Sequence, residues 1–102
     1  MTQLKINDVL YPADFFGKIV DSEWGNRESK FITVEMSYAD ALNLFVDGLK
    51  WSIVYEDENG TEEYDNSLFN IAGSITDNRN GTITAKMGKP TVDELLAMIN
   101  QG

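Results

Sequence analysis

The sequence contains neither cysteine nor histidine. Without cysteine the chain can form no disulfide, and it offers no thiol nucleophile and no thiolate metal ligand. Without histidine it lacks the most common general base and the most common metal ligand. Carboxylates are the main ligands that remain, and on their own they suit harder cations than zinc. We therefore expect no catalytic residues, no bound metal and no cofactor.

Long apolar runs and known catalytic motifs are also missing. No stretch approaches the roughly 20 apolar residues that span a bilayer, and residues 1–5 lack the basic segment and apolar block of a signal peptide. The sequence has no phosphate-binding loop, no dinucleotide-binding glycine pattern and no serine-hydrolase elbow. These absences predict a non-enzymatic chain that stays where it is made, unless a larger assembly carries it out.

Acidic residues dominate the charge of the chain. Seventeen acids outnumber eight bases and give a net charge of −9. Such a surface repels the phosphates of nucleic acids and anionic lipids, and it attracts basic partners. The plainest use of this charge is solubility. As binding partners, it favours proteins over nucleic acids and membranes.

Alternating apolar residues give most of the chain the pattern of β-strands. The 102 residues fit one domain, and a composition of 42% hydrophobic and 25% charged residues is typical of a globular protein. The pattern predicts strands over residues 4–10, 15–22, 30–36, 51–55, 61–64, 70–76 and 82–87. Asn59-Gly60 and residues 77–81 are typical of hairpin turns, and residues 23–29 form a turn-rich connection.

Two segments have helical periodicity instead. Ser37 is a suitable N-cap, and the positions after it predict one apolar helix face made of Tyr38, Ala41, Leu42, Phe45 and Val46. Thr91 and Glu94 form a capping box at the start of a second helix, which extends to about Asn100. The predicted buried stripe of this second helix consists of Val92, Leu95, Leu96 and Ile99.

Together these elements predict a single α+β domain over residues 1–102. Its mostly antiparallel sheet has about six or seven short strands, as expected from the hairpin turns. Two amphipathic helices, one mid-chain and one C-terminal, are expected to cover one face of the sheet. The pattern does not distinguish an open sheet from a curled or barrel-like one.

The densest charged feature is a run of six acids without a base, namely Glu56, Asp57, Glu58, Glu62, Glu63 and Asp65. Calcium-binding loops need a ligand spacing that neither this run nor residues 77–81 has. The run therefore predicts one of two things. It is either a solvated hairpin whose charges discourage edge pairing or a docking surface for a basic partner.

Trp24 and Arg27 lie among polar residues in the turn-rich connection. Tryptophan and arginine are the residue types that most often anchor protein interfaces. The simpler alternative is that Trp24 folds back over an open end of the sheet, because large aromatic side chains are mostly buried. We take these two residues, with the six acids, as the candidate partner-binding residues.

Several segments also carry a family resemblance. They are residues 21–30 (DSEWGNRESK), 45–47 (FVD), 51–53 (WSI), 63–67 (EYDNS), 71–73 (IAG), 80–82 (NGT) and 86–91 (KMGKPT). From about Leu10 onward, the chain resembles a group of small uncharacterised proteins encoded in phages and prophages of Gram-positive bacteria. The resemblance implies a context and assigns no functional residues. That context is a phage structural or accessory protein, or a small protein that acts on the host.

We therefore expect a non-enzymatic interaction or assembly protein, located in the cytoplasm of the host bacterium or in the virion. Its partners are expected to be proteins, including further copies of itself, because phage assemblies repeat their parts by symmetry. An alternative is an acidic decoy that blocks a host nucleic-acid-binding protein. Such a decoy needs carboxylates in two rows with a phosphate-like pitch on one face.

Overall fold

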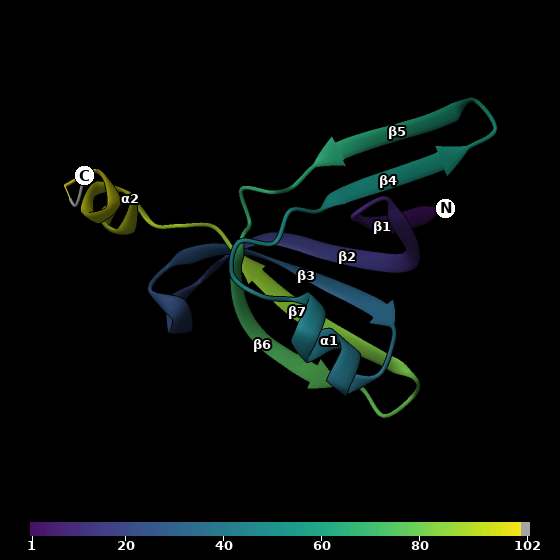
Figure 1. Cartoon of the computed structure of the whole chain (residues 1–102), viewed down its shortest axis with the longest axis horizontal. Coiled ribbons are helices and arrows are strands. Elements are labelled where there is room, and N and C mark those ends of the chain that lie inside the picture. The colour runs from purple at the N-terminus through teal and green to yellow at the C-terminus, as the bar shows by residue number, and fades with distance from the viewer. Residues whose placement is uncertain (101–102) are drawn as a thin grey trace.

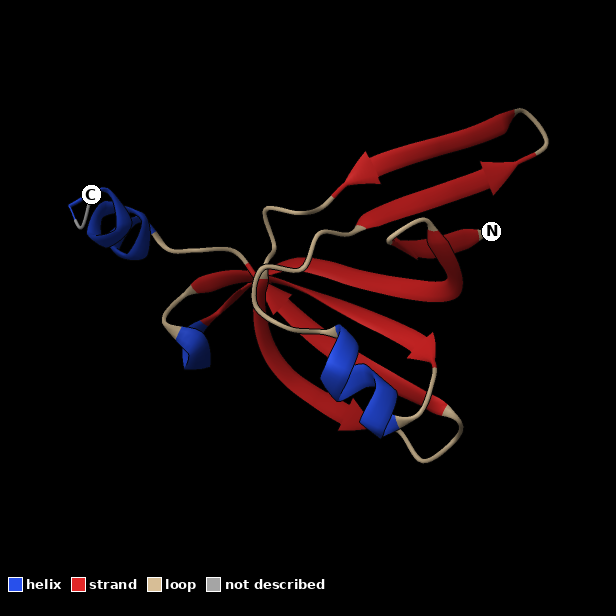
Figure 2. Cartoon of the chain, viewed as in Figure 1, coloured by secondary structure: helices blue, strands red, loops and turns tan. Residues whose placement is uncertain are grey.

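The computed structural model describes residues 1–100 and has the predicted α+β architecture. Seven antiparallel strands form one open, twisted sheet in the order β5-β4-β1-β2-β3-β7-β6 (Figure 1). The strands are β1 Thr2–Ile6, β2 Val9–Asp21, β3 Arg27–Glu35, β4 Ser52–Asp57, β5 Gly60–Asp65, β6 Ile71–Asp77 and β7 Thr82–Gly88. The helices are the short 3-10 helix η1 Ser22–Trp24, α1 Tyr38–Leu44 and α2 Val92–Asn100 (Figure 2).

The first predicted strand, residues 4–10, is wrong, because the chain reverses within it. Asn7 and Asp8 have positive φ angles of 51° and 65° and form a tight turn, so that Ile6 pairs with Val9. Asparagine and aspartate tolerate this left-handed backbone better than most residues. Leu4, Ile6 and Leu10, on both sides of the turn, fit one alternating pattern that Asp8 alone interrupts, and this pattern hides the turn. As a result, β2 begins at Val9 and is much longer than predicted.

Strands β2 and β3 form the predicted hairpin, with an irregularity between Gly17 and Ile19. Gly17 has a φ of +110°, and a Cβ atom there would lie 2.8 Å from the carbonyl oxygen of Ser29. Glycine is therefore required at this position. The irregularity lies near the end of the hairpin that carries η1. The predicted turn-rich connection, residues 23–29, overlaps η1 and the first residues of β3.

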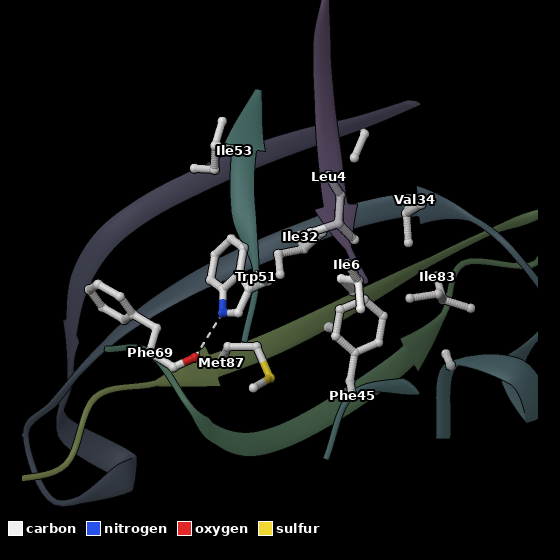
Figure 3. Packing of buried hydrophobic residues seen from close by; sticks show 13 residues of the cluster. Leu4, Ile6, Ile32, Val34, Phe45, Trp51, Ile53, Phe69, Ile83 and Met87 are labelled. Atoms are coloured by element: carbon white, nitrogen blue, oxygen red, sulfur yellow. Dashed lines mark hydrogen bonds between the residues drawn. The ribbon is translucent and has the colours of Figure 1, made fainter. Parts of the chain in front are cut away.

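The core lies on one side of the sheet, around Trp51 (Figure 3). The indole Nε1 of Trp51 donates a hydrogen bond to the carbonyl oxygen of Phe69 at 2.9 Å. Helix α1 lies against β6 and β7, and the predicted N-cap is confirmed, since Ser37 Oγ accepts a hydrogen bond from the Asp40 amide. The predicted apolar face of this helix is only partly buried. Ala41 and Phe45 enter the core, whereas Tyr38, Leu42 and Val46 are exposed.

The start of α2 is also confirmed, because Thr91 and Glu94 form both hydrogen bonds of the capping box. The prediction that α2 covers the sheet is wrong, because the helix stands apart from it (Figure 1). The predicted buried stripe is exposed instead, by 72% at Val92, 44% at Leu95, 51% at Leu96 and 73% at Ile99. The hydrophobic core includes Ala41 of α1, Trp51 and Phe69 but no residue of α2. Within residues 1–100, neither α-helix has the length and apolar character that crossing a membrane requires.

Candidate functional site

The structure places the predicted binding residues in two separate regions. Trp24 and Arg27 belong to η1 and the start of β3, whereas the six acids belong to the hairpin of β4 and β5. The β4–β5 hairpin projects from one end of the molecule, and η1 lies at the other (Figure 1). The two groups therefore do not form a single site.

Trp24 is half-buried and folds back over β6 and β7. A Cβ atom at Gly73 would lie 2.8 Å from the Cη2 atom of Trp24, and one at Gly88 would lie 2.7 Å from its Cζ3 atom. The two glycines thus make the space that the indole occupies. Arg27 Cζ lies 4.8 Å and Lys86 Nζ lies 5.2 Å from the indole centroid, within the range of cation–π attraction. These contacts fit the simpler alternative, in which Trp24 closes an end of the sheet.

Arg27 is also engaged within the chain, and only 8% of it is exposed. Its Nη1 and Nη2 atoms donate to the two carboxylate oxygens of Glu94 at 2.5 and 3.0 Å, and Nη1 also donates to the Lys89 carbonyl oxygen at 3.0 Å. A two-pronged arginine–carboxylate pair of this kind fixes orientation as well as distance. Arg27 therefore holds the first turn of α2 at a set angle to the sheet.

The Arg27–Glu94 pair predicts an unusual acid titration. Hydrogen bonds from Arg27, and then from the Thr91 amide, lower the pKa of Glu94 from 4.5 to about 2. Because the folded chain favours the charged carboxylate, this contribution to stability is complete above about pH 4.5 and is lost as the pH falls through about 2. NMR detection of the Glu94 carboxyl carbon is expected to give a midpoint near 2, and the midpoint is expected to rise in Arg27→Met. A wild-type midpoint near 4.5 would show that the pair does not form in solution.

The exposed stripe of α2 is a surface that the sequence did not reveal. We call it the α2 stripe, and it consists of Val92, Leu95, Leu96 and Ile99. These residues lie three and four positions apart, so they share one face of the helix. The same spacing would suit a buried helix. No feature of the sequence therefore signals that this helix stays outside the core.

The six acids of the hairpin are divided between its two faces. Residues paired across antiparallel strands share a face, and successive residues alternate. The pairs Tyr55–Glu62 and Ile53–Tyr64 therefore place Glu62 on the core-side face, together with Asp57. The opposite face carries Glu56, Glu63 and Asp65, and Glu58 lies at the turn. Glu63 is paired with Lys5 at 2.9 Å.

The core-side face of the hairpin forms an open groove of about 630 Å³. Its walls include Tyr55 and Tyr64, which are 45% and 50% exposed and pack edge to face with their centroids 5.6 Å apart. Glu62 lies beside them and accepts a hydrogen bond from the Tyr64 hydroxyl at 2.5 Å. We call this feature the tyrosine groove. The sequence pointed to its acids but not to its aromatic pair.

Comparison with known proteins adds no family to this description. Comparison with protein-family models, with curated proteins and with solved structures gave no match for the chain. Among residues 1–100, no three acidic side chains converge in a way that would hold a metal ion.

Proposed function

We propose that this protein is a non-enzymatic interaction and assembly component that associates with further copies of itself through the α2 stripe. The observation that carries this proposal is the exposure of four apolar side chains on a helix that is held away from its own core. Burying one such side chain contributes about 1.5–3 kcal/mol. Because 44–73% of each side chain is still exposed, the folded monomer gains only part of this, and the stripe retains a tendency to be covered.

The anchoring of α2 supports a binding role. Arg27 and the capping box hold the first turn of the helix in a fixed geometry. A helix that is oriented before it binds loses less conformational freedom on association than a loose tail would. The stripe is thus presented as a preformed surface.

The size of the stripe favours a repeated contact over an isolated, permanent dimer. At about 25 cal/mol per Å², a side chain worth about 1.5–3 kcal/mol corresponds to about 60–120 Å² of apolar surface. The exposed fractions of the four side chains then amount to roughly 150–300 Å² per copy. Stable interfaces bury about 800 Å² per partner. One pair of stripes therefore makes a weak contact. In a symmetric bundle of several copies around one axis, each α2 stripe contacts two neighbours, so more of it is covered than in a pair.

The test is the mass of the protein in solution as a function of concentration. Light scattering is expected to show a mass that rises above that of one chain, and Leu96→Gln/Ile99→Gln is expected to remain a monomer. Ala97→Gln is the matched control, because residue 97 is exposed and lies away from the stripe. A wild-type chain that stays monomeric at its highest soluble concentration would refute self-association. Equal loss of association in Ala97→Gln would show that the stripe is not the contact.

The resemblance to proteins encoded by phages and prophages supports placing this assembly in a virion or in the cytoplasm of an infected host bacterium. The acidic decoy is the weaker proposal. The hairpin divides its acids between two faces, which does not favour two phosphate-like rows on one of them. Binding to a basic nucleic-acid-binding protein that falls steeply as salt is added would support the decoy, and absence of such binding would exclude it.

A further inference from the structure

We infer that β5 and the tyrosine groove bind an extended basic segment of a partner protein, with an arginine side chain of that segment seated against Tyr55 and Tyr64. This inference goes beyond self-assembly, because it assigns a second site with a different partner. It rests on a free strand edge, an aromatic pair and the charge around them.

Strand β5 offers an open edge for strand addition. It is the last strand in the sheet order and pairs only with β4 among the described strands. All six of its residues, Gly60–Asp65, are exposed. The backbone groups on its outer side therefore face solvent, and an extended peptide can pair with such groups as an additional strand.

The charge of this edge selects among possible occupants. Glu62, Glu63 and Asp65 lie on β5 itself, and the whole chain has a net charge of −9. A second copy of β5 would bring like charges side by side, which is destabilising across a strand pair. A basic strand would instead be attracted. The edge is thus protected against pairing with itself while it stays open to a basic partner.

The tyrosine groove provides a place for a cationic side chain. The two ring faces of Tyr55 and Tyr64 attract a cation, and Asp57 and Glu62 on the same face supply carboxylate acceptors. Lys30 also lines the groove and keeps its positive charge, because it donates a hydrogen bond to the neutral amide of Asn66 and lies 4.8 Å from the centroid of the Phe69 ring. The two carboxylates outnumber this one cation, so the charge of the groove is negative. The groove therefore combines aromatic faces with negative charge.

Arginine fits this combination better than lysine does. Its planar guanidinium stacks on aromatic rings and donates paired hydrogen bonds to a carboxylate. In an added strand, every second side chain would point to the tyrosine groove and the others to the opposite face, beside Asp65. The expected ligand is therefore an extended segment with arginine at alternate positions.

A direct test uses a short end-blocked peptide of alternating arginine and threonine, with its affinity measured by calorimetry at low salt. Two comparison peptides replace the threonines with proline, which cannot donate ladder hydrogen bonds, or the arginines with neutral citrulline. We expect the first peptide to bind and the other two to bind at least about tenfold more weakly. The site does not include α2, so this result does not depend on self-association.

Matched variants locate the site. Glu62→Gln and Glu56→Gln remove the same charge from the same exposed hairpin, but only Glu62 lies on the face of the tyrosine groove. We expect Glu62→Gln to weaken binding roughly tenfold and Glu56→Gln less than about threefold. Tyr64→Ala is expected to weaken it to a similar extent as Glu62→Gln. Equal effects of the two charge variants, equal binding of the proline peptide, or no binding of the first peptide would each overturn the inference.

Discussion

Replacing Trp51 with alanine is expected to lower the free energy of unfolding by about 3–5 kcal/mol, the usual cost of removing a large aromatic side chain from a core. Trp51 is 1% exposed and stacks on Phe15, with centroids 6.2 Å apart and planes 12° from parallel. It also donates its indole hydrogen to Phe69. Because a domain of this size is stable by only about 5–15 kcal/mol, urea unfolding should show a large fall in the midpoint.

The variant Trp51→Phe separates the two contributions of this side chain. Phenylalanine keeps a ring beside Phe15 but leaves the Phe69 carbonyl without its donor, at a cost of about 1–3 kcal/mol. We expect its unfolding free energy to lie between those of wild type and Trp51→Ala. A loss below about 1 kcal/mol in Trp51→Ala would show that the core is not centred on this residue.

Adding a single methyl group at Gly88 is expected to have the second large effect. The Cβ atom of alanine would overlap the Cδ atom of Arg27 and would lie 2.7 Å from Cζ3 of Trp24. Both side chains must then move, and overpacking of this kind costs about 1–3 kcal/mol. We expect the movement of Arg27 to weaken its pair with Glu94. We therefore expect Gly88→Ala to lower stability and to speed hydrogen exchange of the α2 amides.

A double variant provides the control for Gly88→Ala. If the indole occupies the space above Gly88, the methyl group should cost less in a chain that already carries Trp24→Ala. Residues in contact show such non-additivity, whereas distant residues do not. Strict additivity of the two changes would contradict the placement of Trp24.

Local signals in the sequence were sufficient for most of the fold. The Asn59-Gly60 hairpin signal, the Ser37 cap and the Thr91–Glu94 capping box each have a mechanism within a few residues. The structure contains the cap, the capping box and the hairpin, whose turn residues are Glu58 and Asn59 while Gly60 pairs with Asp57. The turn at Asn7 and Asp8 was missed because the apolar residues on both sides of it fit one alternating pattern, which Asp8 alone interrupts. Whether α2 is buried depends on how much of the core other elements fill, and a local pattern carries no such information.

The candidate site was predicted less completely. Trp24 and Arg27 have the residue types of an interface, yet they use their surfaces within the chain, on Gly73, Gly88 and Glu94. The acids of the hairpin were visible as a run. The pairing of Tyr55 with Glu62 places one of these acids beside the tyrosines of the groove. This pairing depends on strand register.

The two surfaces lie far apart, which bears on how they would work together. The β4–β5 hairpin and α2 project from opposite ends of a molecule that extends 46 Å along its longest axis (Figure 1). A partner segment on β5 would therefore leave α2 uncovered. We accordingly propose that the protein joins copies of itself through α2 while it holds a basic partner through β5.

The central claim is that α2 packs against another copy, and distance measurement between spin labels tests it most directly. The chain has no cysteine, so Ala97→Cys places one label per molecule on the face of α2 away from the stripe. Pulsed dipolar spectroscopy at high protein concentration is expected to give a defined distance between copies, which disappears in Leu96→Gln/Ile99→Gln. If the Ala97→Cys protein with an unchanged stripe gives only the featureless decay of isolated molecules at the same concentration, the claim is contradicted.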